Sequence, residues 1–470
     1  MPSSTEPLAI SAISPRDMVA SGLCIGCGAC VSQSAGRGHM RLDRYGQLKP
    51  AGDARWLRTR SAALAQTCPF SPAAANEDAL AAERFAGTGR DDRLGHFAGA
   101  YVGHVSEPGF RDEGSSGGLT TWVAAQLLRR GLVDAVAHVA PGQGGDGPYF
   151  AYRISRSEAQ LRAGAKSRYH PIELSGVIDE IRRVPGRYAI VGIPCFIKAV
   201  HLLRRQERVL AERIVHTLGL FCGHMKSARF VESFAWQLGT RIEEVVALDY
   251  RLKNPDRPAN WYTAHLALKD GTTRSRDWWH LADGDWGAGF FMNSACNSCD
   301  DVMAETADIA FGDAWVEPYS SDGRGTNVVV VRSPLIHAMI ETAIAEGRLA
   351  LTPVDADFVA GTQAAGLRQR REGLAWRLTW PRRGIRPIKR VAPSRALGLR
   401  RKLIYLIRHQ ISAWSHRMFW LARATRQPQL YIGWARSALA IYQGFAYSRG
   451  RIGVLIERLG RPLGLHGRDG

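Results

Sequence analysis

The chain has 470 residues, of which 45% are hydrophobic and 22% charged, and this composition excludes a disordered or collagen-like protein. Its formal charge of +19 is confined to one end, because residues 370–470 hold 22 of the 62 Lys and Arg residues but only 3 of the 43 Asp and Glu residues. No apolar run approaches the roughly 20 residues of a membrane-spanning helix, and residues 1–20 lack the features of a secretory signal. We therefore expect a cytoplasmic protein whose basic tail contacts an anionic partner.

Three cysteines stand close together near the N-terminus, in Cys24-Ile-Gly-Cys27-Gly-Ala-Cys30. The glycines let the backbone fold closely around an inorganic core, and this spacing is the first part of the bacterial ferredoxin motif. The fourth cysteine of that motif precedes Pro, and here the pair occurs further on, at Cys68-Pro69. The four cysteines favour an iron–sulfur cluster, with a zinc site or free thiols as the alternatives.

The next segments predict a strand, a loop and a helix. Residues 81–96 are charged and contain Gly, which suits a linker, and a strand is predicted at 100–105. The loop Gly114-Ser-Ser-Gly-Gly118 follows, and then a helix at 119–130. Free N–H groups at such a helix start favour an anion such as phosphate, although an ordinary helix cap with flexible glycines explains the same residues.

Residues 133–360 predict an α/β arrangement. Gly142, Gly144 and Gly147 form a G-x-G-x-x-G pattern, but a strand rather than a helix is predicted after them, so we interpret them as a hairpin loop. Helical and strand patterns then alternate, which is typical of an α/β domain. Strands are predicted at 133–140, 148–154, 188–193, 214–220, 245–250, 262–268, 308–315 and 326–332, and helices at 172–184, 197–205 and 229–238.

A second group of cysteines is scattered over these elements. Cys195 and Cys222 each follow an apolar strand, and Cys296-Asn-Ser-Cys299 forms a C-x2-C pair. Loops at strand ends gather ligands, so the four thiols could converge on a second metal site, whereas a lone Cys after a strand is often a core residue. Both interpretations stay open on the residues alone. Tryptophans that suit either a cofactor pocket or the core precede the pair, at Trp278, Trp279 and Trp286.

The tail beyond residue 370 predicts a basic amphipathic helix. Its apolar stripe is Leu403, Ile407, Ile411, Trp414, Met418 and Leu421, spaced by three or four residues. Basic and aromatic residues together are typical of a helix that lies on an anionic membrane surface. Packing against a partner or the core is the alternative, and no specific nucleic acid is expected because no reading motif accompanies the charge.

Eight segments occur in the order of a known family. They are Cys24 to Cys30, Cys68-Pro69, Gly114 to Gly118, Ala165-Lys-Ser-Arg-Tyr169, Gly192-Ile-Pro-Cys195, Leu220-Phe-Cys222, Cys296 to Asp300, and Ala307-Asp-Ile-Ala-Phe-Gly-Asp313. Over residues 20–335 the chain resembles the coenzyme F420-reducing hydrogenase and dehydrogenase beta-subunit family of iron–sulfur flavoproteins. The tail lies outside the resemblance.

The resemblance implies cofactors and the residues that hold them. A flavin, normally FAD, is expected at Ser115, Ser116, Gly117, Gly118, Lys166 and Ser167. The cysteine pattern is similar to that of ferredoxin-linked reductases of chlorophyll metabolism, which carry two [4Fe–4S] clusters. It assigns Cys24, Cys27, Cys30 and Cys68 to one cluster and Cys195, Cys222, Cys296 and Cys299 to the other. Coenzyme F420 is a further candidate cofactor.

The expected fold class is α/β (α+β), in four parts. Residues 1–95 are expected to form a ferredoxin-like iron–sulfur module and residues 96–171 the N-terminal flavin-binding region of the beta subunit. Residues 172–365 are expected to form its C-terminal α/β domain with the second cluster, and residues 366–470 a basic amphipathic helical tail.

The expected function is that of an oxidoreductase. It would relay electrons from a ferredoxin-like donor through the clusters to FAD and an organic substrate, with cell-surface polysaccharide metabolism as the expected setting because stand-alone family members are often associated with it. The alternatives are an F420-linked hydrogenase or dehydrogenase subunit, and an electron-transfer or scaffold protein docked at the inner face of the membrane. No catalytic residue is assigned: His170, His224 and His280 are candidates to protonate a substrate, and the sequence does not choose among them.

Overall fold

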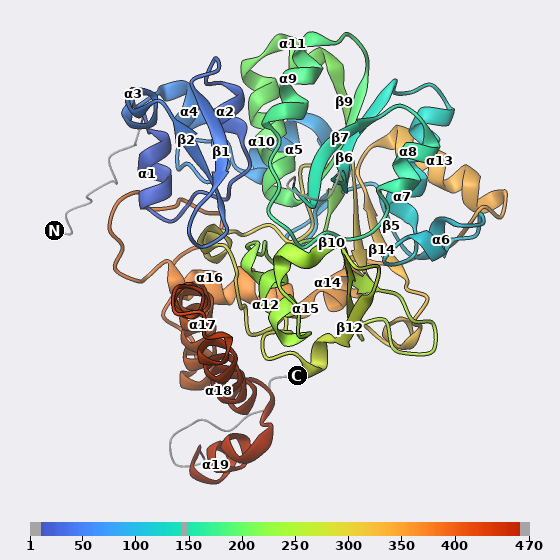
Figure 1. The fold of residues 1–470 in the computed structure, drawn as a ribbon. Coiled ribbons are helices and arrows are strands. Elements are labelled where there is room, and N and C mark those ends of the chain that lie inside the picture. The colour runs from blue at the N-terminus through green and yellow to red at the C-terminus, as the bar shows by residue number, and fades with distance from the viewer. Residues whose placement is uncertain (1–10, 143–147, 461–470) are drawn as a thin grey trace.

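The computed structural model describes residues 11–142 and 148–460, and its centre is one eight-stranded mixed sheet (Figure 1). In spatial order the strands are β15 (Leu349–Pro353), β5 (Gly99–Val105), β14 (Asn327–Val331), β13 (Ile309–Asp313), β9 (Ile214–Leu220), β8 (Tyr188–Gly192), β6 (Ala135–Pro141) and β7 (Phe150–Ser155). The run from β13 to β6 is parallel, and the remaining neighbours are antiparallel. The predicted α/β class is confirmed.

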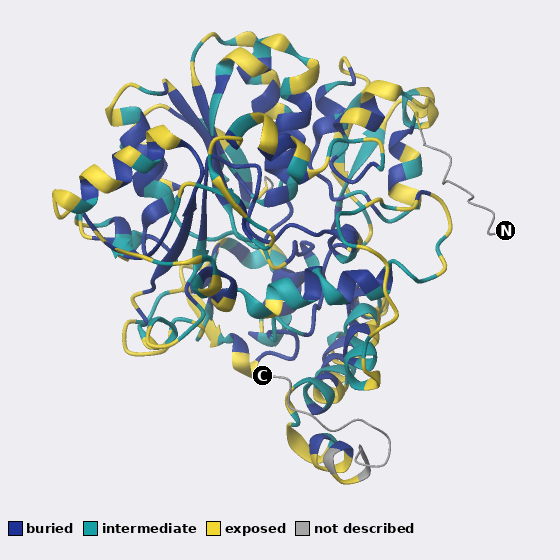
Figure 2. Ribbon diagram, turned by 180° about the vertical axis from the view of Figure 1, so that it is seen from behind, coloured by how far each residue is buried: buried dark blue, intermediate teal, exposed yellow. Residues whose placement is uncertain are grey.

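Helices cover both faces of this sheet. On β8, Tyr188 and Ile190 pack toward one face and Ala189 toward the other, as successive side chains of a strand must. Figure 2 shows the strands buried and the outer sides of the helices exposed. One face carries α9 (Ser175–Arg183), α10 (Pro194–Gln206) and α11 (Arg208–Arg213), and the other carries α6 (Phe110–Glu113), α7 (Leu119–Arg129), α8 (Glu158–Ala163) and α13 (Pro334–Ala345). Burial on both faces explains why the parallel strands are mostly apolar.

The N-terminal cysteines lie in a module of short helices and one hairpin. The helices are α1 (Pro15–Ala20), α2 (Ala29–Ser32), α3 (Ala54–Arg58), α4 (Ala62–Thr67) and α5 (Glu77–Phe85), and the hairpin pairs β1 (Gly38–Leu42) with β2 (Leu48–Gly52). Ile25 and Phe70 of this module share one apolar core with Ile197 of α10. The large sheet likewise takes strands from both predicted middle parts, and the four-part division stays a prediction.

Most predicted elements form within a few residues of their predicted bounds, but one segment differs. Residues 81–96 are not a linker: they hold the end of α5 and a hairpin of β3 (Gly89–Asp91) with β4 (Gly95–Phe97), and Leu94 is fully buried. A tight charged hairpin has the same composition as a linker, so composition misled us. β6 and β7 form the predicted antiparallel hairpin, although Gly144 and Gly147 lie outside the described residues.

The rest of the chain forms a smaller layer beside the large sheet. Its strands β10 (Val245–Leu252), β11 (Thr263–Leu268) and β12 (Thr273–Asp277) form an antiparallel sheet with α12 (Arg229–Gln237) nearby. The chain then continues through α14 (Ala356–Thr362), α15 (Ala364–Arg370) and α16 (Glu372–Arg377) to α17 (Leu399–Ala424), α18 (Pro428–Tyr447) and α19 (Gly450–Gly460). In Figure 1, α17 and α18 lie side by side as a hairpin against this layer.

The predicted apolar stripe on α17 is wrong in its details. Of its six residues only Ile411 is fully buried, while Trp414 and Leu421 are exposed. The face that packs on the body instead carries Ile404, Ile411, Ser415, Phe419 and Ala422. Ser415 lies on this buried face because its hydroxyl accepts a hydrogen bond from the Phe291 N–H at 2.9 Å. The hydropathy pattern of the sequence does not indicate such a polar contact. Within residues 11–142 and 148–460, no helix is both long and apolar enough to cross a membrane.

Candidate redox site

The four N-terminal cysteines, which we name the first cysteine set, lie together as free thiols. The charges of Cys24, Cys27 and Cys68 all act on Cys30, which burial and this proximity hold at a pKa well above its ordinary value. Gly28 has φ of +83°, and a Cβ there would lie 2.3 Å from Oε2 of Glu173. The glycines of this motif are therefore required for the tight turn that surrounds the thiols.

Cys195, Cys222, Cys296 and Cys299 form a second cysteine set around a small cavity. Cys195 is in the first turn of α10 directly after Pro194, and Cys222 follows the end of β9. Cys296 lies in a short 3-10 helix, Ser294–Ser298, and accepts a hydrogen bond from the Met225 N–H at 3.3 Å. The structure thus brings together four residues that are up to 104 positions apart in the chain.

Both sets match a four-thiolate cluster in donor type and number. Burial raises the pKa of Cys68 and of Cys222 to about 12, so metal-free thiols would stay protonated there. Within the described ranges, no group of three or more His, Cys, Asp or Glu residues is placed to hold a single ion. A [4Fe–4S] cluster binds each thiolate through a different iron, so its ligands stand further apart than those of one ion.

A large cavity of about 890 Å³ adjoins the second set, and Cys222 lines both cavities. Five of the six predicted flavin residues line the large cavity, namely Ser115, Ser116, Gly118, Lys166 and Ser167. Gly117 lies just behind its wall, where a Cβ would be 2.8 Å from Oδ1 of Asn327 and from the Gly103 carbonyl oxygen. The two predicted segments are joined, because the Ser167 N–H donates to Oγ of Ser115 at 2.8 Å.

This end of the large cavity has the features of an anion site. Helix α7 begins there after Gly118, which has no side chain to cap it, and Oδ1 of Asn327 accepts a hydrogen bond from the Leu119 N–H at 3.2 Å. Uncapped N–H groups and the helix dipole both attract negative charge. Lys166 has φ of +117°, a backbone conformation that L-residues rarely adopt, and its Nζ lies 3.5 Å from Oδ2 of Asp249. Such strain is typical of residues held in place for function.

The walls of the large cavity are aromatic, with polar atoms left unpaired. Nε1 of Trp278 and Nε2 of His224 are buried without a hydrogen-bond partner in the structure. The His224 ring also stacks on Trp286, with centroids 4.2 Å apart. Unpaired buried polar atoms are costly unless a ligand satisfies them. The cavity therefore fits a flat ring system with hydrogen-bonding atoms at its edge, such as a flavin.

The structure separates the three candidate histidines. His280 is exposed and does not line the large cavity, whereas His170 and His224 both do. Nδ1 of His170 lies 3.0 Å from the Tyr250 hydroxyl, and burial lowers the pKa of His170 to about 4. His224 has the unpaired nitrogen.

Three residues beyond residue 370 also line the large cavity, and the sequence analysis missed them. Arg408 of α17 donates to the Gly287 carbonyl oxygen, and Tyr447 and Arg449 lie at the end of α18. A Cβ on Gly287 would be 2.4 Å from the Tyr447 hydroxyl, so only glycine leaves room for this contact. The glycine-rich segment 284–289 was the available signal, but the tail that it receives lies over 100 residues further on.

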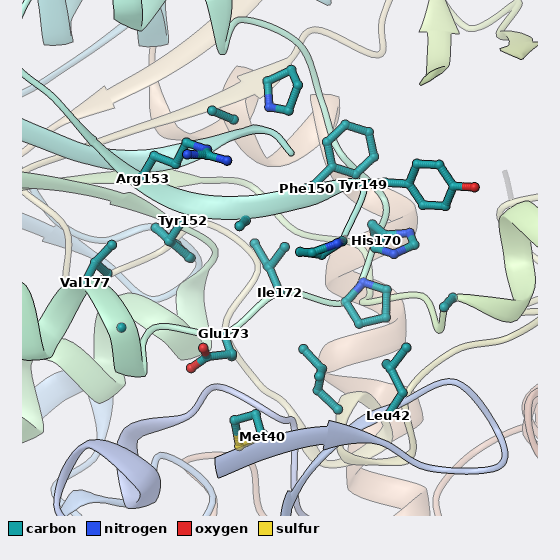
Figure 3. A pocket seen from close by; sticks show the side chains of 18 of the residues that line it. Met40, Leu42, Tyr149, Phe150, Tyr152, Arg153, His170, Ile172, Glu173 and Val177 are labelled. Carbon is teal, nitrogen blue, oxygen red and sulfur yellow. The ribbon is translucent and has the colours of Figure 1, made fainter. Parts of the chain in front are cut away.

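Another hollow, which we name the second hollow, lies between the N-terminal module and strand β7 (Figure 3). Its volume of about 1110 Å³ exceeds that of the large cavity beside the second cysteine set. Met40 and Leu42 of β1 face Phe150 and Ile172 across it. His170 and Ile172 line both this hollow and the large cavity, so the segment that they belong to is the wall between the two. Apart from the candidate His170, none of the predicted flavin-binding residues or cysteines lines the second hollow.

This arrangement defines a redox protein, and comparison with known proteins gives its family. Residues 100–179 match the profile for the N-terminal part of the coenzyme F420 hydrogenase/dehydrogenase beta subunit, and residues 186–357 match the profile for its C terminus. The matches cover more than half of the chain, so the protein belongs to the coenzyme F420 hydrogenase/dehydrogenase beta-subunit family, whose members are oxidoreductase subunits.

The similarity to individual proteins is weaker than the similarity to the family profiles. A chain of the xenon-derivatised F420-reducing [NiFe] hydrogenase complex from Methanosarcina barkeri has a TM-score of 0.47 and 16% sequence identity, over 61% of this chain and 94% of that chain. That likeness is too weak to carry an argument. A search of curated proteins gives no match.

Proposed function

We propose that the protein is an iron–sulfur flavoprotein oxidoreductase, with two [4Fe–4S] clusters and FAD, that passes electrons from a ferredoxin-like donor to an organic substrate. The observation that carries the proposal is the position of Cys222. This residue lines both the small cavity of the second cysteine set and the large cavity. Electrons on the second set would therefore be adjacent to whatever the large cavity binds.

When bound, the clusters would carry single electrons and the flavin one or two. The chain's own residues would bind the flavin and orient its ring. The N-terminal end of α7 and Lys166 would hold the phosphates, while Trp278 and His224 would hydrogen-bond the ring. The aromatic walls would exclude water, which strengthens each of these electrostatic contacts.

The donor and the substrate belong to the proposal as well. Coenzyme F420 suits the family equally well as electron donor, and reduction of the bound flavin by reduced F420 but not by reduced ferredoxin would favour it. Cell-surface polysaccharide metabolism remains the setting that we propose for the substrate, because a tail that binds membranes would suit a lipid-linked intermediate.

Metal and flavin content test the proposal directly. Anaerobically purified protein should contain about eight iron, about eight acid-labile sulfide and about one FAD per chain. Cys68→Ser and Cys222→Ser should each retain about four iron, because each removes one ligand of a different cluster. The matched control is Ser294→Ala, which alters the turn beside Cys296 without removing a thiol and should retain all the iron. Zinc without flavin would overturn the oxidoreductase proposal, and about four iron in the unaltered protein would overturn the second cluster.

A second candidate function, attachment to an anionic membrane, is favoured by the outer face of the tail hairpin. Trp414 and Trp420 are each 45% exposed on α17, and Leu406 and Leu421 are exposed beside them. The Arg417 guanidinium lies 5.1 Å from the centre of the Trp414 ring. Basic groups among exposed aromatic residues suit the interface of an anionic bilayer.

Vesicle flotation tests this attachment. The full chain should float with vesicles that contain phosphatidylserine but not with neutral ones, and about 1 M salt should release it because the Debye length then falls to about 3 Å. Trp414→Ser with Trp420→Ser should weaken binding roughly ten-fold, since each removes apolar area from the interface. Leu335→Ser, at an equally exposed apolar position on α13, should change nothing. Equal binding to neutral vesicles would contradict the proposal.

A further inference from the structure

Arg370 is a buried cation whose side chain reaches the small cavity of the second cysteine set. It is the last residue of α15, is only 2% exposed, and lies beyond residue 357, where the match to the family ends. Four thiols and one guanidinium thus share one small cavity.

The hydrogen bonds of Arg370 hold its charge at the partition between the two cavities. Its Nη2 donates to the carbonyl oxygens of Cys222 at 2.9 Å and Gly223 at 2.7 Å. Its Nη1 is buried and has no hydrogen-bond partner in the structure. Across the described part of the chain, Arg370 forms no direct ion pair; Asp301 lines the same cavity, and its charge acts on Arg370 only from beyond ion-pair distance. A buried guanidinium without a directly paired counter-charge is costly.

Negative charge on the second cysteine set would supply the missing counter-charge. A cluster held by four thiolates is an anion, and reduction adds one electron to it without making or breaking a bond. A fixed positive charge in a cavity of low dielectric favours the form with the extra electron.

We propose that Arg370 is a positioning residue that raises the reduction potential of the cluster on the second cysteine set by stabilising its reduced form. The inference rests on the proposed function, because it requires that cluster. Its consequence is that electrons from a ferredoxin-class donor collect next to Cys222, at the wall of the large cavity.

A redox titration followed by electron paramagnetic resonance, with dithionite as the reductant, tests this role in the full chain. In Arg370→Gln, the midpoint potential of one cluster should fall by at least about 59 mV, a ten-fold change in the one-electron equilibrium. The other cluster should keep its potential. Arg370→Lys retains the positive charge, so the midpoint potential of that cluster should stay within about 59 mV of its value in the unaltered protein.

Iron content separates the failure of this inference from the failure of the proposed function. If the unaltered protein lacks iron, the proposed function fails; if Arg370→Gln keeps about eight iron and both potentials, only the role of Arg370 fails. Arg377→Gln is the matched control, because Arg377 is also buried and donates to the Asn297 carbonyl oxygen at 2.9 Å but does not line the small cavity. The proposal would be overturned if Arg377→Gln shifted the midpoint potential as far as Arg370→Gln does. It would also be overturned if Arg370→Lys lowered that potential by about 59 mV or more.

Discussion

Replacing Arg390 with Met should lower the free energy of unfolding by about 3–5 kcal/mol, because buried Glu305 loses its closest cationic partner and keeps only the more distant Arg371, at 3.6 Å. The Arg390 side chain bonds both carboxylate oxygens of Glu305, at 2.5 and 2.9 Å, and lies 3.4 Å from Oδ2 of Asp300. Glu305 and Asp300 are almost completely buried. Lys389 pairs with Asp300 at 3.3 Å but does not reach Glu305 in any ion pair of the described residues.

Urea unfolding of the full chain with its bound groups measures this loss. The matched control is Arg324→Met, which breaks a 2.9 Å ion pair with Asp322. The Arg324 side chain is 62% exposed, so the loss of stability there should be much smaller than in Arg390→Met. Equal losses in the two variants would mean that the Arg390 cluster stabilises the fold no more than a surface ion pair does.

This cluster also explains why the charge of the tail was only partly interpreted from the sequence. A basic tail on a neutral body predicts an external anionic partner. In the structure, Arg390 and Lys389 are instead neutralised within the fold, by carboxylates that follow Cys299 in the sequence. A count of charged residues does not show which basic and acidic side chains form ion pairs in the folded protein.

Local patterns predicted the large sheet well, since a buried parallel strand has a run of apolar residues that stands out in any sequence. The spacing of Cys24, Cys27 and Cys30 is equally local. The contacts that complete the large cavity are not, because Arg408 reaches Gly287 only after α17 docks through polar groups such as Ser415. Such docking depends on backbone groups that only the folded chain presents.

Lowering the pH from 7 to 4 should destabilise the protein by about 5–10 kcal/mol. Burial lowers the pKa of His138, His170 and His416 to about 4 each. In the unfolded chain they bind protons below about pH 6.5, whereas in the folded chain they stay neutral until about pH 4. Each histidine therefore contributes about 3 kcal/mol that is present above pH 6.5 and is lost as the pH falls toward 4. The buried carboxyl of Asp301, whose pKa is raised, acts in the opposite direction and reduces the total.

Urea unfolding at pH 7, 6, 5 and 4 should show this loss, and His416→Gln isolates one contribution to it. His416 hydrogen-bonds the Ser412 carbonyl oxygen at 2.9 Å through Nδ1, and a glutamine amide can replace that bond without titrating. The variant should lose about 2 kcal/mol less than the unaltered protein between pH 7 and pH 5. Acid-labile groups affect both proteins alike, so they cancel in the difference. If the pH dependence of His416→Gln matches that of the unaltered protein, the neutral buried His416 is not a source of acid sensitivity.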